Sequence, residues 1–228
     1  MNIEEIVRIA SVAAIPMVLA VTGHEVAHAY AAKRNGDYSA ELAGRLTLNP
    51  LAHIDWLGTV ILPLVLLSLH SPFLFGWAKP VPVDPKQFNN YRKGLRQVAL
   101  SGIIANLLMT LVWAFLLVNS SHINVEEDSG LFALLVSFIR EMSEFGVVIN
   151  TVLAIFNLLP IPPLDGSRVI SSFLKGEISR HYQSLEPYGF WVILFLMFSG
   201  LFRWLGPIVG YIVSLSIHLF EQLFHFLV

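Results

Sequence analysis

Long runs of uncharged, mostly apolar residues alternate along this 228-residue chain with short clusters of charged residues. A helix that crosses the roughly 30 Å hydrocarbon core of a bilayer needs about 20 such residues, and a shorter run can extend into its flanks. The charge-free runs cover residues 9–23, 56–78, 97–125, 145–164, 187–202 and 204–220. The pattern therefore predicts an all-α polytopic membrane protein with about five to six membrane helices.

The composition agrees with this class and excludes several others. Hydrophobic residues make up 55% of the chain and charged residues only 13%, whereas soluble domains carry about 25% charged residues. Too little polar surface remains to cover a water-soluble fold. The same numbers exclude disorder and nucleic-acid binding through a basic surface. Because the chain has no cysteine, a metal site would need histidine and carboxylate ligands.

The distribution of charge predicts an orientation. Basic residues cluster within residues 33–45, 79–96 and 168–180, whereas the connection 119–130 has three acidic residues and no basic one. Since Lys and Arg concentrate on the cytoplasmic side, we expect a multi-pass cell-membrane protein with its N-terminus outside and its C-terminus in the cytoplasm. Residues 56–78 then have cytoplasmic flanks on both sides. Together with Pro63 and Ser71-Pro72, this favours a re-entrant hairpin; one crossing that violates the charge rule is the alternative.

The first apolar run leads directly into the motif His24-Glu25-Val-Ala-His28. On a helix, side chains four residues apart share one face, so both imidazoles can reach a single ion. Tetrahedral Zn²⁺ accepts two neutral imidazoles, one further protein ligand and a water. Glu25 can take a proton from that water and later protonate a leaving amine. The alternative is a metal-free glutamate and two histidines at the cytoplasmic edge of the helix.

A second polar group follows a later apolar run, between Asn157 and Gly166. Prolines at positions 160, 162 and 163 cannot continue a regular helix, so the chain must bend there. Asp165 could supply the third zinc ligand, and together with Glu25 it would balance the charge of Zn²⁺. The Asn157 amide could hold a developing oxyanion or position a peptide carbonyl. The alternative for Asp165-Gly166 is an ordinary turn.

Two segments between these motifs predict a short β element at the cytoplasmic face. Residues 41–48 alternate partly between apolar and polar positions, and residues 79–83 could be the neighbouring edge, with Pro80 and Pro82 restricting it to that position. Such an edge could dock an unwound substrate as an added strand; two irregular loops are the alternative. His53 and Asp55 lie two residues apart, which is more typical of capping than of a second metal pair.

Together, His24-Glu25-Val-Ala-His28 and Asn157-Leu-Leu-Pro-Ile-Pro-Pro-Leu-Asp165-Gly166 resemble the paired signatures of the site-2 protease family of intramembrane zinc metalloproteases. Residues 44–55 and 76–83 resemble the linking segments of small prokaryotic members that have no PDZ domain. Residues 101–106 resemble the family's small-Gly-Pro-x-x-Asn segment, with Ile103 where proline is usual. The likeness covers about residues 15–180.

This resemblance implies a site with one Zn²⁺ per chain. The implied zinc ligands are His24, His28 and Asp165. Glu25 would be the general base, and Asn157 would assist substrate or transition-state binding. Asn106 is expected to form interhelical hydrogen bonds and is a candidate for substrate contact.

The predicted function is hydrolysis of peptide bonds within or near transmembrane segments of other membrane proteins, as in regulated intramembrane proteolysis. The expected partners are a transmembrane protein substrate and the lipid bilayer, with no nucleic acid; the sequence predicts no oligomeric state. Alternatives are a membrane metal or proton transporter that uses His and Asp ligands, and a non-catalytic scaffold with a structural zinc. Residues 1–228 are expected to form a single domain, with a catalytic core over about 5–180 and a C-terminal helical hairpin over about 186–228.

Overall fold

The computed structural model of the chain describes residues 3–69, 76–124 and 130–227 and is all-α, as predicted. Ser71-Pro72 and the acidic residues 126–128 of the predicted external loop lie outside these ranges. The α-helices within them are α1 (Ile3–Arg34), α2 (Ser39–Leu42), α3 (Leu62–Ser68), α4 (Tyr91–Ser121), α5 (Gly130–Leu158), α6 (Asp165–Phe173), α7 (Gly176–Gln183), α8 (Glu186–Phe198) and α9 (Leu205–Leu227). Shorter helical turns are η1 (Pro50–Ala52), η2 (Trp56–Ile61), η3 (Pro85–Gln87) and η4 (Leu201–Trp204).

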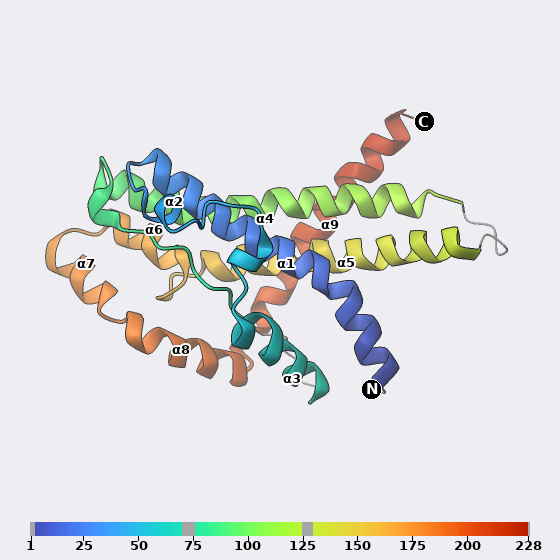
Figure 1. The fold of residues 1–228 in the computed structure, drawn as a ribbon, viewed down its shortest axis with the longest axis horizontal. Coiled ribbons are helices and arrows are strands. Elements are labelled where there is room, and N and C mark those ends of the chain that lie inside the picture. Colours follow the sequence, from blue (N-terminus) through green and yellow to red (C-terminus); the bar gives the residue numbers. More distant parts are fainter. Residues whose placement is uncertain (1–2, 70–75, 125–129, 228) are drawn as a thin grey trace.

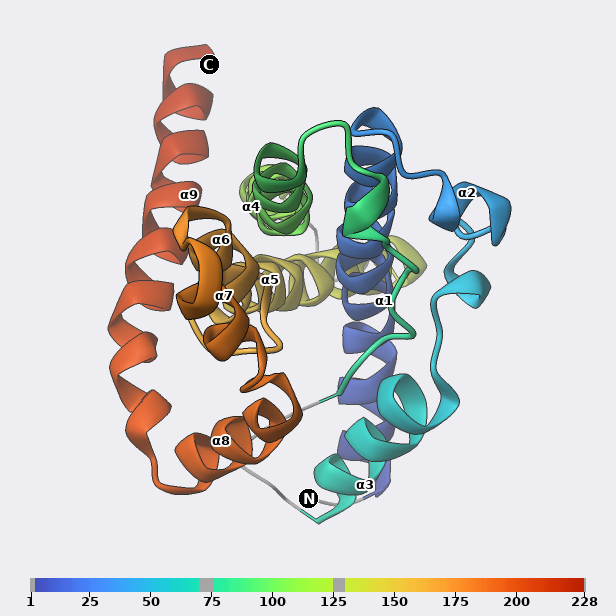
Figure 2. The same ribbon diagram turned by 90° about the vertical axis from the view of Figure 1, so that its left-hand side faces the viewer.

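Helices α4 and α5 run side by side through the centre of the structure (Figure 1). Helix α1 packs against one side of this pair and α9 against the other, so the pair lies between them in Figure 2. The short helix α6 packs against both α4 and α5. This arrangement brings the start of α6 close to α1 and α4, which are distant from it in sequence.

Polar side chains join the central helices inside the otherwise apolar core. Asn106 donates to the Asn150 side chain at 3.1 Å, and the hydroxyls of Thr110 and Thr151 are 3.2 Å apart. All four side chains are buried. Hydrogen bonds of this kind between helices are typical of proteins that fold in a membrane, where water cannot satisfy polar groups.

Among the described residues, three helices, α1, α4 and α9, are long and apolar enough to cross a membrane. Helix α5 also covers a predicted run, but it begins at Gly130, well before the first charge-free residue at 145. Two of its three charged residues have partners outside the helix. Arg140 donates to the Ser120 carbonyl at 2.8 Å, and the Glu141 carboxylate lies 3.8 Å from the Arg8 guanidinium.

The segment from 56 to 78 returns to its starting point. Its first part forms η2 and α3, with Pro63 in the first turn of α3. The Trp77 backbone N–H then donates to the Gly58 carbonyl at 3.2 Å, and the Thr59 hydroxyl donates to the Trp77 carbonyl at 2.8 Å. The two ends of the segment are therefore adjacent, a feature that the predicted re-entrant hairpin requires.

The prediction of a short β element is wrong for the described residues. Residues 39–42 form helix α2, and residues 79–83 are not paired as a strand. The two segments are neighbours, but a side chain joins them: the Arg45 guanidinium donates to the Lys79 carbonyl at 2.7 Å. Pro80 and Pro82 have no backbone N–H to donate, which removes ladder hydrogen bonds at those positions.

Candidate metal centre

His24 and His28 lie one turn apart on α1, and both rings are buried against α4. Their Nε2 atoms are 2.9 Å apart. Gly102 of α4 leaves the space that the rings occupy, because a Cβ at this position would lie 2.6–2.7 Å from atoms of both rings. The i, i+4 spacing therefore works as predicted, and a glycine on a neighbouring helix makes room for it.

Asp165, the first residue of α6, completes the group. Its Oδ2 atom lies 3.1 Å from His24 Nε2 and 3.0 Å from His28 Nε2. Helix α5 ends at Leu158, and the proline-rich turn that follows directs α6 back toward α1. Gly166 permits this tight return, since a Cβ there would lie 2.1 Å from the Leu158 carbonyl oxygen.

Hydrogen bonds to the other ring nitrogens orient both imidazoles. His24 Nδ1 lies 2.6 Å from Asn106 Oδ1, and His28 Nδ1 lies 2.8 Å from the Val98 carbonyl oxygen. Both oxygens are acceptors, so each Nδ1 is the donor in its hydrogen bond, and each Nε2 is the nitrogen whose lone pair is available to a metal ion. Two lone pairs and one carboxylate oxygen therefore face a common point.

This donor set fits zinc. The three ligand atoms lie within 4.8 Å of one another, and Asp165 Oδ2 accepts no hydrogen bond from a described residue. Bonds of about 2.0–2.2 Å to a tetrahedral zinc place its ligand atoms roughly 3.4 Å apart. The observed separations of 2.9–3.1 Å need to widen by only a few tenths of an ångström. A cysteine-free site of two imidazoles and one carboxylate also leaves a fourth position open, as in catalytic zinc sites.

Asn106 supports His24 in this structure. Its amide nitrogen donates to the Ala20 carbonyl and to Asn150 Oδ1, both at 3.1 Å, which turns Oδ1 toward His24. The side chain is fully buried. Contact between Asn106 and substrate stays a prediction, whereas the interhelical hydrogen bonds are confirmed. The sequence did not reveal that the partner of His24 lies 82 residues away.

We expect Asn106→Ala to weaken zinc binding about 10–100-fold, the usual effect of removing a partner that orients a metal ligand. The His24 ring would lose the acceptor that orients it. Zinc affinity can be measured by competition with a chromogenic chelator. Asn119→Ala is the matched control, because that amide donates only to the Phe115 carbonyl of its own helix. Equal zinc affinity in both variants would contradict the supporting role of Asn106.

An apolar cavity of about 510 Å³ adjoins the metal group. We call it the site cleft; it is lined by His24, Glu25 and Asn157, by residues 76–78, and by apolar side chains of α1, α5 and α8. The Glu25 carboxylate accepts the Val81 backbone N–H through Oε2 at 2.8 Å. The Asn157 amide donates to the Leu153 carbonyl at 3.0 Å. The two residues predicted to be catalytic thus share one cavity with His24, a candidate metal ligand.

The turn that carries Asp165 is held from outside by α7 and α8, which sequence analysis did not foresee. The Tyr182 hydroxyl donates to the Pro160 carbonyl at 2.7 Å, and partial burial raises the pKa of Tyr182, which keeps this donor protonated. Gly189 of α8 lies against the next part of the turn. A Cβ at residue 189 would be 1.6 Å from the Pro162 carbonyl oxygen, so α8 can dock here only through glycine.

Gly189→Ala is therefore expected to destabilise the protein by about 1–3 kcal/mol, the usual range for overpacking, and to reduce zinc affinity through displacement of the Asp165 turn. Thermal unfolding in detergent and chelator competition measure the two effects. Gly210→Ala is the matched control, since this glycine lies inside α9 and a Cβ there would meet nothing within 4 Å. If Gly189→Ala behaves like Gly210→Ala, α8 does not hold the turn.

The second pair of candidate ligands has a structural role. Asp55 caps η2, with its Oδ1 accepting the Gly58 N–H at 2.8 Å, which confirms the capping interpretation. His53 is buried, and its Nε2 lies 2.9 Å from the Thr47 carbonyl oxygen. Within the described ranges, neither residue belongs to a group that could hold a metal.

A His-Glu-x-x-His helix completed by a distant aspartate, in a chain with three candidate membrane helices, defines a membrane zinc metalloprotease. Residues 12–200 match Peptidase family M50, and the chain belongs to this family. It is 36% identical over 190 residues to the "Putative zinc metalloprotease YwhC" of Bacillus subtilis, covering 82% of this chain and 80% of that protein. It is 29% identical over 194 residues to the "Putative zinc metalloprotease Rip2" of Mycolicibacterium smegmatis, covering 85% and 69%. No solved structure matches the chain.

Proposed function

We propose that this protein is an intramembrane zinc metalloendopeptidase that hydrolyses peptide bonds within or near transmembrane segments of other membrane proteins. The observation that carries the proposal is the convergence of His24 and His28, from a candidate membrane helix, with Asp165 beside an apolar cleft. Glu25 stands next to this group without belonging to it. A glutamate in that position is available for proton transfer.

Zinc bound by the three ligands would act as a Lewis acid on the scissile carbonyl and would lower the pKa of a water molecule. Glu25 accepts a proton from the attacking water and returns it to the leaving amine. The Val81 N–H holds Glu25 Oε2, which leaves Oε1 for this transfer. Asn157 has one amide hydrogen beyond the one donated to Leu153. That hydrogen can bind the carbonyl oxygen as negative charge develops on it.

A membrane placement follows from the same proposal. Helices α1, α4 and α9 span the bilayer. Helix α5 adds a fourth crossing, fewer than the about five to six predicted from the charge-free runs, and the shorter α8 does not cross. Residues 56–78 form a re-entrant hairpin. The basic clusters place the N-terminus outside and the start of α4 in the cytoplasm. Helix α9 runs in the same direction as α4, because Phe220 contacts Phe115 and Phe224 stacks on His122. We therefore propose that the C-terminus lies outside as well, in contrast to the cytoplasmic position predicted from the charges alone. We propose that residues 1–228 act as one domain, with a catalytic core over about 5–180 and α8 and α9 as a C-terminal hairpin.

The test is cleavage of candidate single-pass membrane proteins by the purified, full-length protein in detergent or proteoliposomes. Cleavage should disappear after treatment with a zinc chelator and return when zinc is added. Mass spectrometry of the products should place the cut within or close to the transmembrane segment. Cleavage that survives complete removal of the metal would overturn the proposed mechanism, and cuts only in distant soluble regions would overturn the proposed substrate class.

A further inference from the structure

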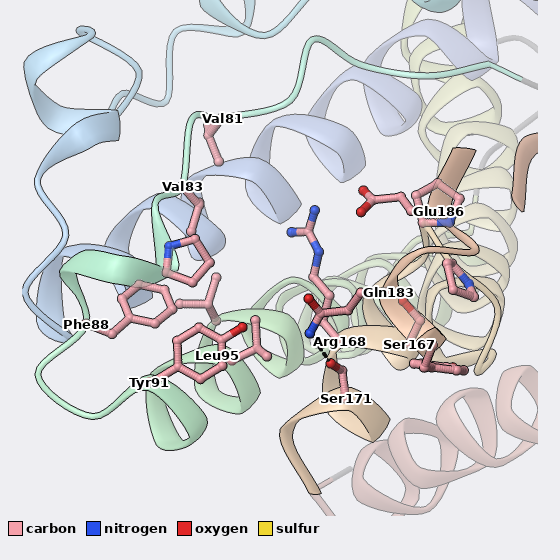
Figure 3. Close-up of a pocket in the computed structure, with 15 residues that line it drawn as sticks. Val81, Val83, Phe88, Tyr91, Leu95, Ser167, Arg168, Ser171, Gln183 and Glu186 are labelled. Carbon is pink, nitrogen blue, oxygen red and sulfur yellow. Dashed lines mark hydrogen bonds between the residues drawn. The ribbon is translucent and has the colours of Figure 1, made fainter. Parts of the chain in front are cut away.

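A second cavity, of about 240 Å³, is lined in part by Val81 and Val83 (Figure 3), which follow residues 76–78 of the site cleft in the chain. We call it the Arg168 pocket. Its apolar wall includes Val81, Val83, Phe88 and Leu95, and its polar wall comes from α6, α7 and the first turn of α8. Figure 3 shows the two walls facing each other, with the charged groups of Arg168 and Glu186 extending into the space between them.

The Arg168 pocket adjoins the candidate metal centre on several sides. Val81, which lines the pocket, donates its backbone N–H to Glu25 at 2.8 Å. Val98, also in the lining, binds His28 through its carbonyl. Pro163 lines both the pocket and the site cleft. A polypeptide lying along residues 76–83 would therefore pass Glu25 on its way from one cavity to the other.

The two walls match different parts of a peptide. The volume equals roughly eight water molecules at about 30 Å³ each, enough for one large apolar side chain. On the opposite wall, neither the Arg168 guanidinium nor the Glu186 carboxylate forms a hydrogen bond or an ion pair with another described residue. A guanidinium offers only donors and a carboxylate only acceptors. Together they complement the carbonyl and N–H groups of an extended backbone.

We propose that the Arg168 pocket is a substrate subsite that selects one large apolar side chain on one side of the scissile bond. Val83, Phe88 and Leu95 contact that side chain. Arg168 and Glu186 bind the adjoining substrate backbone. Because the two opposite charges balance, the subsite has no net preference for an acidic or a basic side chain. This inference rests on the proposed protease function, since it names a specificity determinant of the same reaction.

The test uses a transmembrane peptide that the wild-type protein cleaves, with each position within four residues of the cut replaced in turn by Leu and by Ala. At one position the wild type should prefer Leu by about tenfold in kcat/KM, the scale expected for a well-filled apolar pocket. Val83→Phe fills the pocket and should abolish or reverse this preference, measured as the ratio of kcat/KM for the Leu and Ala peptides. Val112→Phe, the same change at an exposed position of α4, should leave the preference intact.

Arg168→Gln tests the polar wall without disturbing the core, because the side chain is exposed. It should raise KM several-fold for the Leu and Ala peptides alike. A selective loss of activity toward peptides with an acidic residue would overturn the backbone role. Zinc-dependent cleavage whose side-chain preference is unchanged by Val83→Phe would overturn the subsite alone. Absence of zinc-dependent cleavage in the wild type would overturn the proposed function and the subsite with it.

Discussion

Glu25→Gln is expected to reduce peptide-bond cleavage by about 10²–10⁴-fold, the range for loss of a general acid–base group, while zinc content stays at the wild-type level. The substitution keeps the size of the side chain, and the amide oxygen can still accept the Val81 N–H. Glutamine cannot take up a proton from water at neutral pH. None of the three candidate ligands is altered, so metal binding and chemistry are separated by a single change. Elemental analysis and a cleavage assay on the same preparation measure both quantities.

Glu41→Gln is a suitable control for this variant, because Glu41 forms an ion pair with Lys33 away from the metal group. It should cleave substrate at the wild-type rate. A membrane metal transporter would use His24, His28 and Asp165 but would not need Glu25, and it would show zinc flux into proteoliposomes that survives Glu25→Gln. Retained cleavage by Glu25→Gln would end the proposed role of Glu25 as general base.

Local spacing allowed the most reliable predictions. The charge-free runs predicted helices α4 and α9 to within several residues, and the prolines after Leu159 marked the end of α5. The spacing of His24 and His28 placed both imidazoles on one helix face, because helix geometry alone determines that relation. Asp165 could be added only because a broken helix and a family resemblance both pointed to it. Its distance from the histidines depends on how α6 packs, which no local pattern contains.

Long-range contacts account for what the sequence did not reveal. Asn106 and the Val98 carbonyl, both on α4, orient the two imidazoles. Every residue type has a backbone carbonyl, so the contact with Val98 could not be predicted from the sequence. The contact of Gly189 with the Pro162 carbonyl could not be predicted from the sequence either, since a glycine in a helix can serve several purposes. The β element was predicted from partial alternation over 41–48, but helix α2 forms at its start, and the prolines of 79–83 cannot complete a ladder. Alternation over so few residues is a weak signal when tertiary contacts compete with it.

Asp165→Ala is expected to lower zinc affinity by more than about 100-fold, since even the outer partners of zinc ligands contribute about 10–100-fold. The change removes the single carboxylate of the metal group and leaves two neutral imidazoles in a buried site. Asp165→Asn keeps an oxygen at nearly the same place without its negative charge and should bind zinc with intermediate affinity. Competition with chelators of graded strength ranks the two variants against the wild type.

Ser167→Ala is the matched control, because Ser167 is buried in the same helix and donates only to the Leu164 carbonyl of its own turn. It should bind zinc like the wild type. The comparison also distinguishes loss of a ligand from collapse of the turn. If Asp165→Ala lost zinc because α6 had moved, its melting temperature would fall toward that of Gly189→Ala. If only the ligand is lost, the melting temperature of the zinc-free variant stays near that of the zinc-free wild type. An unchanged zinc content in Asp165→Ala would remove Asp165 from the ligand set, and the His24–His28 pair would then need another partner.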